Sequence, residues 1–407
     1  MNIILKIFKQ TFWQILGKIV TSVCTFIILG IVARNYKEEG TGLFTLALTY
    51  LTMFFLLGDF GFNAHVLRNL KSQTPLRGPA VKSEWQKLLG TRLIWSGILV
   101  VLAVTTLPFW PFATDSFSKS VIFGSLAILG SGIFITSNLI FQEKLRYDMS
   151  VIASSAGTVI YLFLVLVFSQ NKWPMEYLLA SYTIGWIFMG ATTLFFVRNF
   201  IKNIVPIFDF SFIKNLVKES WPIAATLALN VIYFRADSFM LAFYKTPSDV
   251  GIYNLAYTIF QSVLVLPTFI MNAYYPLMLK SLAYIKWVGL GLLVLALLGT
   301  VATLFFSPIV INILTGGGFG GSAQSLQILS LGFPAYFLSA FLMWLLVAKG
   351  MYKKMLLLYT SGMIINLFLN FLYIPKYSFL AASWITVISE YIILIMQIIT
   401  LRSIIFK

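Results

Sequence analysis

Two ionisable residues, Arg235 and Asp237, lie near the middle of an otherwise apolar stretch that runs from Ile223 to Tyr244. A stretch of this length can cross a bilayer as a helix. A charged side chain at membrane depth is costly, so such residues usually face protein or water and carry a function. On a helix the two side chains point about 200° apart. We therefore expect one of them to face a cavity and the other to meet a neighbouring helix.

Both residues have two readings. Arg235 either binds an anionic substrate or gates its passage, or it forms an interhelical ion pair. For Asp237 the sequence favours an interhelical contact, with a substrate or gating role as the alternative. Lys18 either extends to the interface or lies in the cavity, and Arg34 is either a helix-terminal interfacial charge or a substrate contact. Asp59, which lies in the run 57–63, is expected to act as a hinge or an interhelical strut, with a substrate contact as the alternative.

Three further polar residues lie in apolar stretches near the C-terminus. Asn366 and Asn370 are four residues apart and share one face of a helix, where interhelical hydrogen bonding is expected. Glu390 is either a proton-coupling site or a structural contact. The only histidine, His65, cannot build a metal cluster or a Ser-His-Asp triad in the usual way. The residues therefore favour a transporter over an enzyme.

The elements that position these residues are predicted to be transmembrane helices. Of the 407 residues 59% are hydrophobic and only 10% are charged, a composition that a soluble domain does not need. Backbone groups in lipid must be satisfied internally, so long apolar runs form helices. Pro267 and Pro334 are expected to kink theirs. We predict twelve spans, at 10–33, 42–66, 88–110, 119–141, 149–169, 175–197, 221–244, 251–275, 287–307, 322–347, 355–374 and 380–401.

The charge distribution predicts the topology. The net charge is +16, but most Lys and Arg residues, Arg92 among them, fall on the loops and helix ends that are cytoplasmic if the N-terminus is inside. The positive-inside rule then places both termini in the cytoplasm. The basic excess serves topology, so no nucleic-acid partner is expected. Trp287 and other Trp residues lie near predicted helix ends, as interfacial anchors do.

An internal repeat divides the chain into a six-helix bundle at 1–205 and a second at 206–407. The stretch that begins at Gly42 (Gly-Leu-Phe-Thr-Leu-Ala) is matched by the one that begins at Gly251 (Gly-Ile-Tyr-Asn-Leu-Ala), 209 residues later, and the offset holds to Ala64 and Ala273. Six helices per half give both halves one orientation. Transporters built this way bind substrate between the halves and rock them to alternate access.

Several of these stretches together resemble the polysaccharide-exporter, O-antigen flippase branch of the multidrug/oligosaccharidyl-lipid/polysaccharide flippase superfamily. The resemblance covers essentially the whole chain. It is carried by the segments Arg235-Ala-Asp237-Ser-Phe-Met-Leu241, Val250-Gly-Ile-Tyr-Asn-Leu-Ala256, Asn366 to Tyr377, Ala381 to Thr386 with Ser389-Glu390, and Gly42 to Ala47 with Gly58-Asp-Phe-Gly61.

The resemblance implies an all-α polytopic fold with two bundles around a central cavity. It implies a flippase that moves an undecaprenyl-pyrophosphate-linked oligosaccharide, such as an O-antigen, capsule or exopolysaccharide repeat unit, across the inner membrane. Arg235 would meet the pyrophosphate. No cofactor is implied, but H+ or Na+ would be exchanged, with Asp237, Asp59 and Glu390 as candidates. The protein would be a monomer that works beside the polymerase and chain-length proteins of its pathway.

Two other functions stay open. A cation-coupled drug antiporter of the same superfamily would need an acidic cavity for its cationic substrates, whereas here Arg235 and Lys18 accompany the carboxylates. A membrane glycosyltransferase or ligase would handle the same lipid. Such enzymes tend to need a substantial outer loop with catalytic Arg or His residues, and the predicted outer loops are short.

Overall fold

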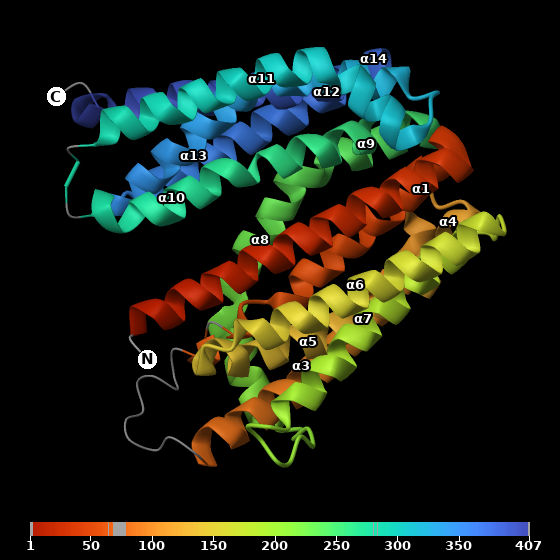
Figure 1. The fold of residues 1–407 in the computed structure, drawn as a ribbon, viewed down its shortest axis with the longest axis vertical. Coiled ribbons are helices and arrows are strands. Elements are labelled where there is room, and N and C mark those ends of the chain that lie inside the picture. The colour runs from red at the N-terminus through yellow and green to blue at the C-terminus, as the bar shows by residue number, and fades with distance from the viewer. Residues whose placement is uncertain (1–2, 64, 68–78, 280, 283, 406–407) are drawn as a thin grey trace. The chain divides into compact units, whose positions relative to one another are not determined.

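Every regular element in the described part of the chain is a helix (Figure 1). The computed structural model describes residues 3–63, 65–67, 79–279, 281–282 and 284–405. The helices are α1 (Ile3–Asp59), α3 (Pro79–Thr105), the short 3-10 helix η1 (Leu107–Phe109), α4 (Asp115–Ser125), α5 (Ala127–Lys144), α6 (Tyr147–Gln170), α7 (Met175–Val197), α8 (Phe210–Tyr244), α9 (Pro247–Val263), α10 (Val265–Met278), α11 (Ile285–Thr315), α12 (Gly320–Ser330), α13 (Phe333–Ala348) and α14 (Tyr352–Ile405).

Among the described residues, eight helices are long and apolar enough to cross a membrane, or nine if the bent pair α12–α13 forms one span. The longest, α1 and α14, have 57 and 54 residues. As straight rods they would be about 80 Å long, far more than the ~30 Å hydrocarbon core. Each contains one residue with non-helical backbone angles, Lys37 and Ser378. Each helix is therefore long enough to cross a membrane twice, with a break at which the chain can turn. The total of twelve crossings and the cytoplasmic location of both termini stay predictions.

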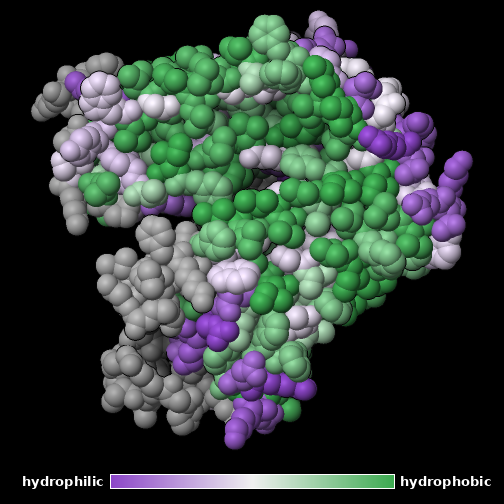
Figure 2. All heavy atoms as spheres, in the orientation of Figure 1, coloured by the Kyte–Doolittle hydropathy of each residue, from purple (hydrophilic) through white to green (hydrophobic). Residues whose placement is uncertain are grey.

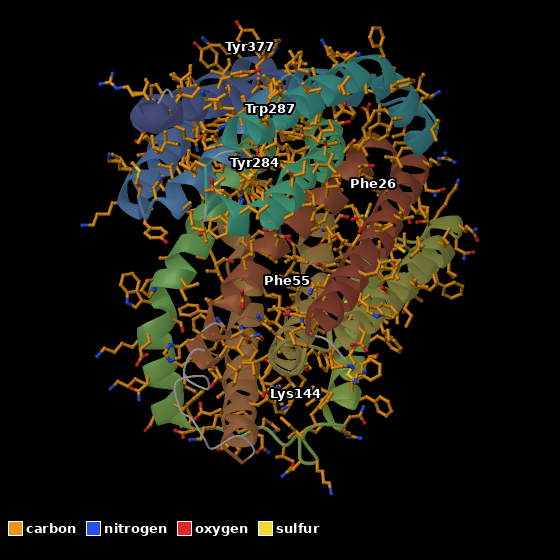
Figure 3. All side chains as sticks on the ribbon, turned by 60° about the vertical axis from the view of Figure 1, so that its left-hand side comes forward. Phe26, Phe55, Lys144, Tyr284, Trp287 and Tyr377 are labelled. Atoms are coloured by element: carbon orange, nitrogen blue, oxygen red, sulfur yellow. The ribbon has the colours of Figure 1, made fainter. Side chains whose placement is uncertain are left out.

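The outer surface of the helices is apolar. On the face drawn in Figure 2, hydrophobic residues cover the lengths of the helices and hydrophilic ones gather near their ends. On α11, Leu298, Phe305 and Ile313 are more than 60% exposed, which hydrocarbon tolerates and water does not. Trp287, at the start of the same helix, is also exposed (Figure 3), which fits the interfacial anchor expected there.

The chain forms two compact units. The first contains Met1–Asn35 and Ala47–Phe234, and the second contains Tyr36–Leu46 and Arg235–Lys407. This division differs from the repeat boundary at 205/206, because the first part of α8 packs with the N-terminal helices and the short segment 36–46 packs with α9. The boundaries 1–205 and 206–407 therefore stay a prediction about duplicated sequence.

Small residues allow close helix crossings in the first unit, where α7 packs along α4, α5 and α6. At the α6–α7 crossing, a Cβ on Gly157 would lie 2.6 Å from the carbonyl oxygen of Gly185. At the α5–α7 crossing, a Cβ on Gly190 would lie 3.0 Å from the carbonyl oxygen of Gly130. Close backbone approach of this kind supplies the van der Waals contact that holds helices together in lipid.

The helices are interrupted near both prolines at which we expect kinks. α9 ends at Val263 and α10 begins two residues later, so Pro267 falls in the first turn of the new helix. Proline has no N–H to donate to the preceding turn, which ends the hydrogen-bond ladder there. Pro334 falls in the first turn of α13, and α12 and α13 are bent by 45°.

Side chains hold the break inside α14. Ser378 has φ 52°, a left-handed conformation that costs a non-glycine residue energy. Its hydroxyl donates a 2.6 Å hydrogen bond to the carboxylate of Asp249. Asp249 and Thr246 form the capping box of α9, so the same carboxylate caps one helix and fixes the break in another.

Arg92, one of the basic residues that the charge distribution places at cytoplasmic helix ends, is fully buried. It lies at the point where the second part of α1 ends. Its guanidinium donates to the backbone carbonyl oxygens of Gly58 and of Asp59 (2.7 Å), and to the side-chain oxygen of Asn63 (2.8 Å). These are carbonyls that the helix end leaves without partners, and a cation is favourable there. The position in the sequence could not distinguish a buried arginine from an interfacial one.

We predict that Arg92→Leu lowers the free energy of unfolding by about 3–5 kcal/mol, because the buried carbonyls lose their donors. Arg92→Lys should lose less, since an ammonium reaches fewer of them. Thermal unfolding in detergent, followed by tryptophan fluorescence, measures the difference. The control is Arg198→Leu, which changes an exposed arginine. Equal losses of stability at both positions would disprove the structural role of Arg92.

Asp209 ties the start of α8 to α3. Its carboxylate lies 2.9 Å from the ammonium of Lys87 and accepts a 3.0 Å hydrogen bond from the backbone N–H of Phe212. The hydrogen bond from Lys87, and secondarily the one from Phe212, lower the pKa of Asp209 below its ordinary value of 3.8. The ionised form is thus favoured in the folded protein.

The lowered pKa predicts how stability depends on pH. The contribution of Asp209 is fully present above its ordinary pKa and is lost as pH falls through the lowered one. Wild type should therefore exceed Asp209→Asn in melting temperature by a constant amount at neutral pH, and the gap should close below about pH 4. Melting curves across pH test this, with the exposed Glu39→Gln as control. A gap that widens on acidification would contradict it.

Candidate functional site

Asp237 is buried on α8, accepts hydrogen bonds from two groups and lies close to a third. One oxygen accepts from the backbone N–H of Ser238 at 2.8 Å. The other accepts from the hydroxyl of Tyr253 on α9 and lies 3.5 Å from the hydroxyl of Thr386 on α14. The two hydroxyls are 3.2 Å apart. Three helices thus converge on one carboxylate, which provides the polar contacts that a buried acid requires.

The hydrogen bonding continues beyond the carboxylate. The hydroxyl of Ser238 donates a 2.7 Å hydrogen bond to the side-chain oxygen of Asn254, the next residue along α9 from Tyr253. Ser238 and Asn254 are both buried. The result is a polar cluster inside the second unit, built from Asp237, Ser238, Tyr253, Asn254 and Thr386.

Arg235 lies in a different environment. Its side chain is half-buried, and its guanidinium carbon is 6.0 Å from the centre of the Tyr257 ring. Tyr257 lies one turn beyond Tyr253 on α9 and stacks on it, with ring centres 5.4 Å apart. Both charged side chains therefore reach α9, whereas we expected only one to meet a neighbouring helix. The long side chain of arginine makes this possible despite the separation on α8.

Asn366 and Asn370 form an interhelical contact in α14. Asn370 donates to Asn366 at 2.9 Å, and Asn366 donates to Ser389 at 3.2 Å across the break in that helix. Glu390, next to Ser389, is buried. The geometry agrees with the expected hydrogen bonding for the two asparagines, and the coupling role of Glu390 stays a prediction.

The remaining candidates lie on α1, in the first unit. Lys18 and Arg34 have exposed side chains. Asp59 lies 3.9 Å from the guanidinium of Arg92, at the end of the helix, which fits a strut. The substrate and coupling roles of these three residues stay predictions.

Sequence reasoning missed the partners of Asp237. Tyr253, Asn254 and Thr386 were noticed only as parts of matching segments, and Ser238 only as a neighbour of Arg235. One signal was available: Asn254 falls in the duplicated stretch, where the first copy has Thr45. A polar residue kept at the same place in two apolar copies indicates a contact, but not its partner.

A model of the family "Polysaccharide biosynthesis protein" matches residues 7–282, more than half of the chain. The chain belongs to this family. The matched region contains Arg235, Asp237 and the α9 side of the cluster.

Relatives and solved structures agree with this membership. A Shigella dysenteriae protein named "Putative O-antigen transporter" is 24% identical over 326 residues, which cover 78% of this chain and 80% of that protein. The lipid II flippase MurJ, in an inward closed conformation, has a similar structure, with a TM-score of 0.80, 14% identity and coverage of 95% of this chain and 87% of that one. An inward-facing multidrug resistance MATE transporter of the MOP superfamily gives a TM-score of 0.73, 14% identity and 94% coverage of both chains.

At these identities the structural matches show the fold alone. This member of the polysaccharide biosynthesis protein family is a multi-span membrane protein with the helical fold of MOP-superfamily transporters. The predicted flippase family is confirmed.

We predict that the two charged residues differ in their effect on stability. Asp237→Ala leaves the buried Tyr253 hydroxyl and Ser238 N–H without their acceptor, so unfolding should become easier by about 1–3 kcal/mol. Arg235→Ala removes a half-buried contact with an aromatic ring, worth about 0.5–1 kcal/mol. Chemical unfolding in detergent compares them, with Asp237→Asn as the variant that keeps one acceptor. An equal or larger loss for Arg235→Ala would disprove the difference.

Proposed function

We propose that this protein is a flippase that moves an undecaprenyl-pyrophosphate-linked oligosaccharide across the inner membrane by alternating access. The observation that carries the proposal is the half-buried side chain of Arg235 on the 35-residue helix α8 of a polysaccharide biosynthesis family member. The Shigella dysenteriae relative, which is named for O-antigen transport, supports the substrate class.

Arginine suits a pyrophosphate for chemical reasons. Its planar guanidinium keeps its charge and presents paired N–H donors that match phosphate oxygens. A lipid-linked sugar carries that anionic group through a region of low dielectric, where an unpaired charge is costly. A cation on α8 offsets that cost during the passage. Lys18 and Arg34 on α1 are the further cationic candidates along the path.

We also propose that transport is coupled to H+ or Na+. Asp237 is the leading site because its carboxylate is buried and is held by hydroxyls from α9 and α14. Binding a cation or a proton would neutralise it without exposing it to water. Glu390 and Asp59 are the other acids proposed to take part. The protein would act as a monomer beside the polymerase and chain-length proteins of the same pathway.

The second candidate is a cation-coupled drug antiporter. The likeness to the MATE transporter favours it, because the fold accommodates drug export in that protein. The cation at Arg235 disfavours it, because a cationic drug is repelled by a guanidinium and attracted by an acidic site. The two candidates therefore predict opposite effects when the charge on Arg235 is removed.

We expect Arg235→Ala to reduce translocation of lipid-linked oligosaccharide roughly 100-fold, the cost of about two charge-assisted hydrogen bonds. Arg235→Lys should retain part of the activity. The assay uses purified protein in proteoliposomes, with an imposed H+ or Na+ gradient, and scores how fast the sugar becomes accessible to a lectin on the other side.

The controls separate the two functions. Arg402→Ala, which removes an exposed arginine near the end of α14, should leave translocation unchanged. Uptake of a cationic dye is measured on the same vesicles. Unchanged sugar translocation in Arg235→Ala would rule out the substrate role, and dye transport that rises in that variant would favour the antiporter.

A further inference from the structure

The two copies of the internal repeat contact each other at their equivalent glycines. Gly42 in the segment 36–46 packs against the backbone of Pro247, and Gly251 on α9 packs against the backbone of Glu38. A Cβ on Gly251 would lie only 2.7 Å from the backbone nitrogen of Gly42. Glu38 and Pro247 stand 209 residues apart, as the two glycines do. The contact is therefore a local two-fold crossing, in which each copy presents the same surface to the other.

A third equivalent pair joins this crossing by a hydrogen bond. Asn254 donates from its side-chain nitrogen to the hydroxyl of Thr45 at 3.1 Å, across a separation of 209 residues. Both side chains are buried. Glu38 adds a 3.0 Å hydrogen bond that it accepts from the hydroxyl of Ser248. Glycines thus permit the approach, and polar side chains fix it.

Asn254 also belongs to the cluster around Asp237. Its side-chain oxygen accepts from Ser238, whose backbone N–H donates to Asp237. Ser238 therefore links the buried acid to the crossing through its own covalent frame, since its backbone N–H bonds to Asp237 and its hydroxyl bonds to Asn254, which in turn donates to Thr45. The Asn254 amide donates to one neighbour and accepts from the other, so its orientation is set by both ends at once.

A change of charge on Asp237 should propagate along this path. The carboxylate accepts from the backbone N–H of Ser238 and from the hydroxyl of Tyr253. When a cation or proton neutralises it, its attraction for the Ser238 N–H weakens, so the backbone at Ser238 can shift together with the hydroxyl that holds Asn254. Buried hydrogen-bond networks respond as a unit, since each member polarises and orients the next.

We propose that Ser238, Asn254 and Thr45 are positioning residues that couple the charge on Asp237 to the crossing of segment 36–46 over α9. An ionised Asp237 holds the amide of Asn254 in the orientation that closes the crossing, and a neutralised one releases it. The role of this coupling in transport rests on the proposed function. The coupling itself can be measured in purified protein without substrate.

The test measures how often the crossing is closed. Cysteines replace Glu38 and Ser248, whose side chains are hydrogen-bonded to each other in the closed crossing. The native cysteine, Cys24, is changed to alanine so that it cannot form a cross-link. The rate of oxidative cross-linking in detergent is the readout. A double-mutant cycle then combines Asp237→Asn with Asn254→Leu.

We expect Asp237→Asn to slow cross-linking on the order of fivefold. We also expect it to have no further effect once Asn254→Leu has cut the path. Thr45→Val, which keeps its shape and loses the hydroxyl, gives the same answer if Asn254→Leu fails to fold. The matched control is Thr258→Val, because that hydroxyl bonds only within α9, to the carbonyl of Asn254; its effect should simply multiply with that of Asp237→Asn.

Two results would overturn the proposal. One is a cross-linking rate that Asp237→Asn leaves unchanged. The other is independent, multiplying effects of Asp237→Asn and Asn254→Leu, since a merely structural Asn254 would behave in that way. Because no substrate is present, failure here leaves the flippase assay unaffected, and failure of that assay leaves this coupling intact.

Discussion

The packing of α8, α9 and α14 depends on burying the carboxylate of Asp237 among them. A desolvated acid must be hydrogen-bonded or neutralised, and Asp237 accepts from the backbone N–H of Ser238 on α8 and from the hydroxyl of Tyr253 on α9, with the hydroxyl of Thr386 on α14 beside them. This requirement fixes the rotation of three helices about their axes, since each must present a particular residue to the same point. Packing of apolar side chains alone would tolerate several rotations, so the acid adds specificity at a cost in stability.

The repeat shows that this acid belongs to one half only. At the offset of 209 residues, Asp237 corresponds to Ile28 and Tyr253 to Phe44, both buried and apolar. Thr45 and Asn254 remain polar in both copies and bond to each other. The crossing is therefore alike on its two sides at Gly42 and Gly251 and at Thr45 and Asn254, whereas the first copy has an apolar residue at the position of Asp237.

Hydropathy predicted where helices lie, because long apolar runs have few alternatives in lipid, and proline chemistry predicted the breaks near Pro267 and Pro334. The contacts of the site could not be predicted in the same way. Hydrogen bonds such as those between Tyr253 and Asp237, or between Asn254 and Thr45, depend on how separate helices are rotated and tilted. A single sequence does not show which residues of two helices face each other, so it does not predict these pairs. Arg92 shows the same limit, since its charge and position fitted a topology signal while its partners were distant backbone carbonyls.

The two arginines differ in burial, and burial separates a structural role from a proposed functional one. Arg92 is wholly enclosed, and its guanidinium is engaged by the carbonyls of a helix end and by Asn63, so little of its hydrogen-bonding capacity can be offered to a substrate. Arg235 is half-buried, and its guanidinium carbon lies 6.0 Å from the centre of the Tyr257 ring. This difference in burial is why the substrate role is proposed for Arg235 and a structural role is assigned to Arg92.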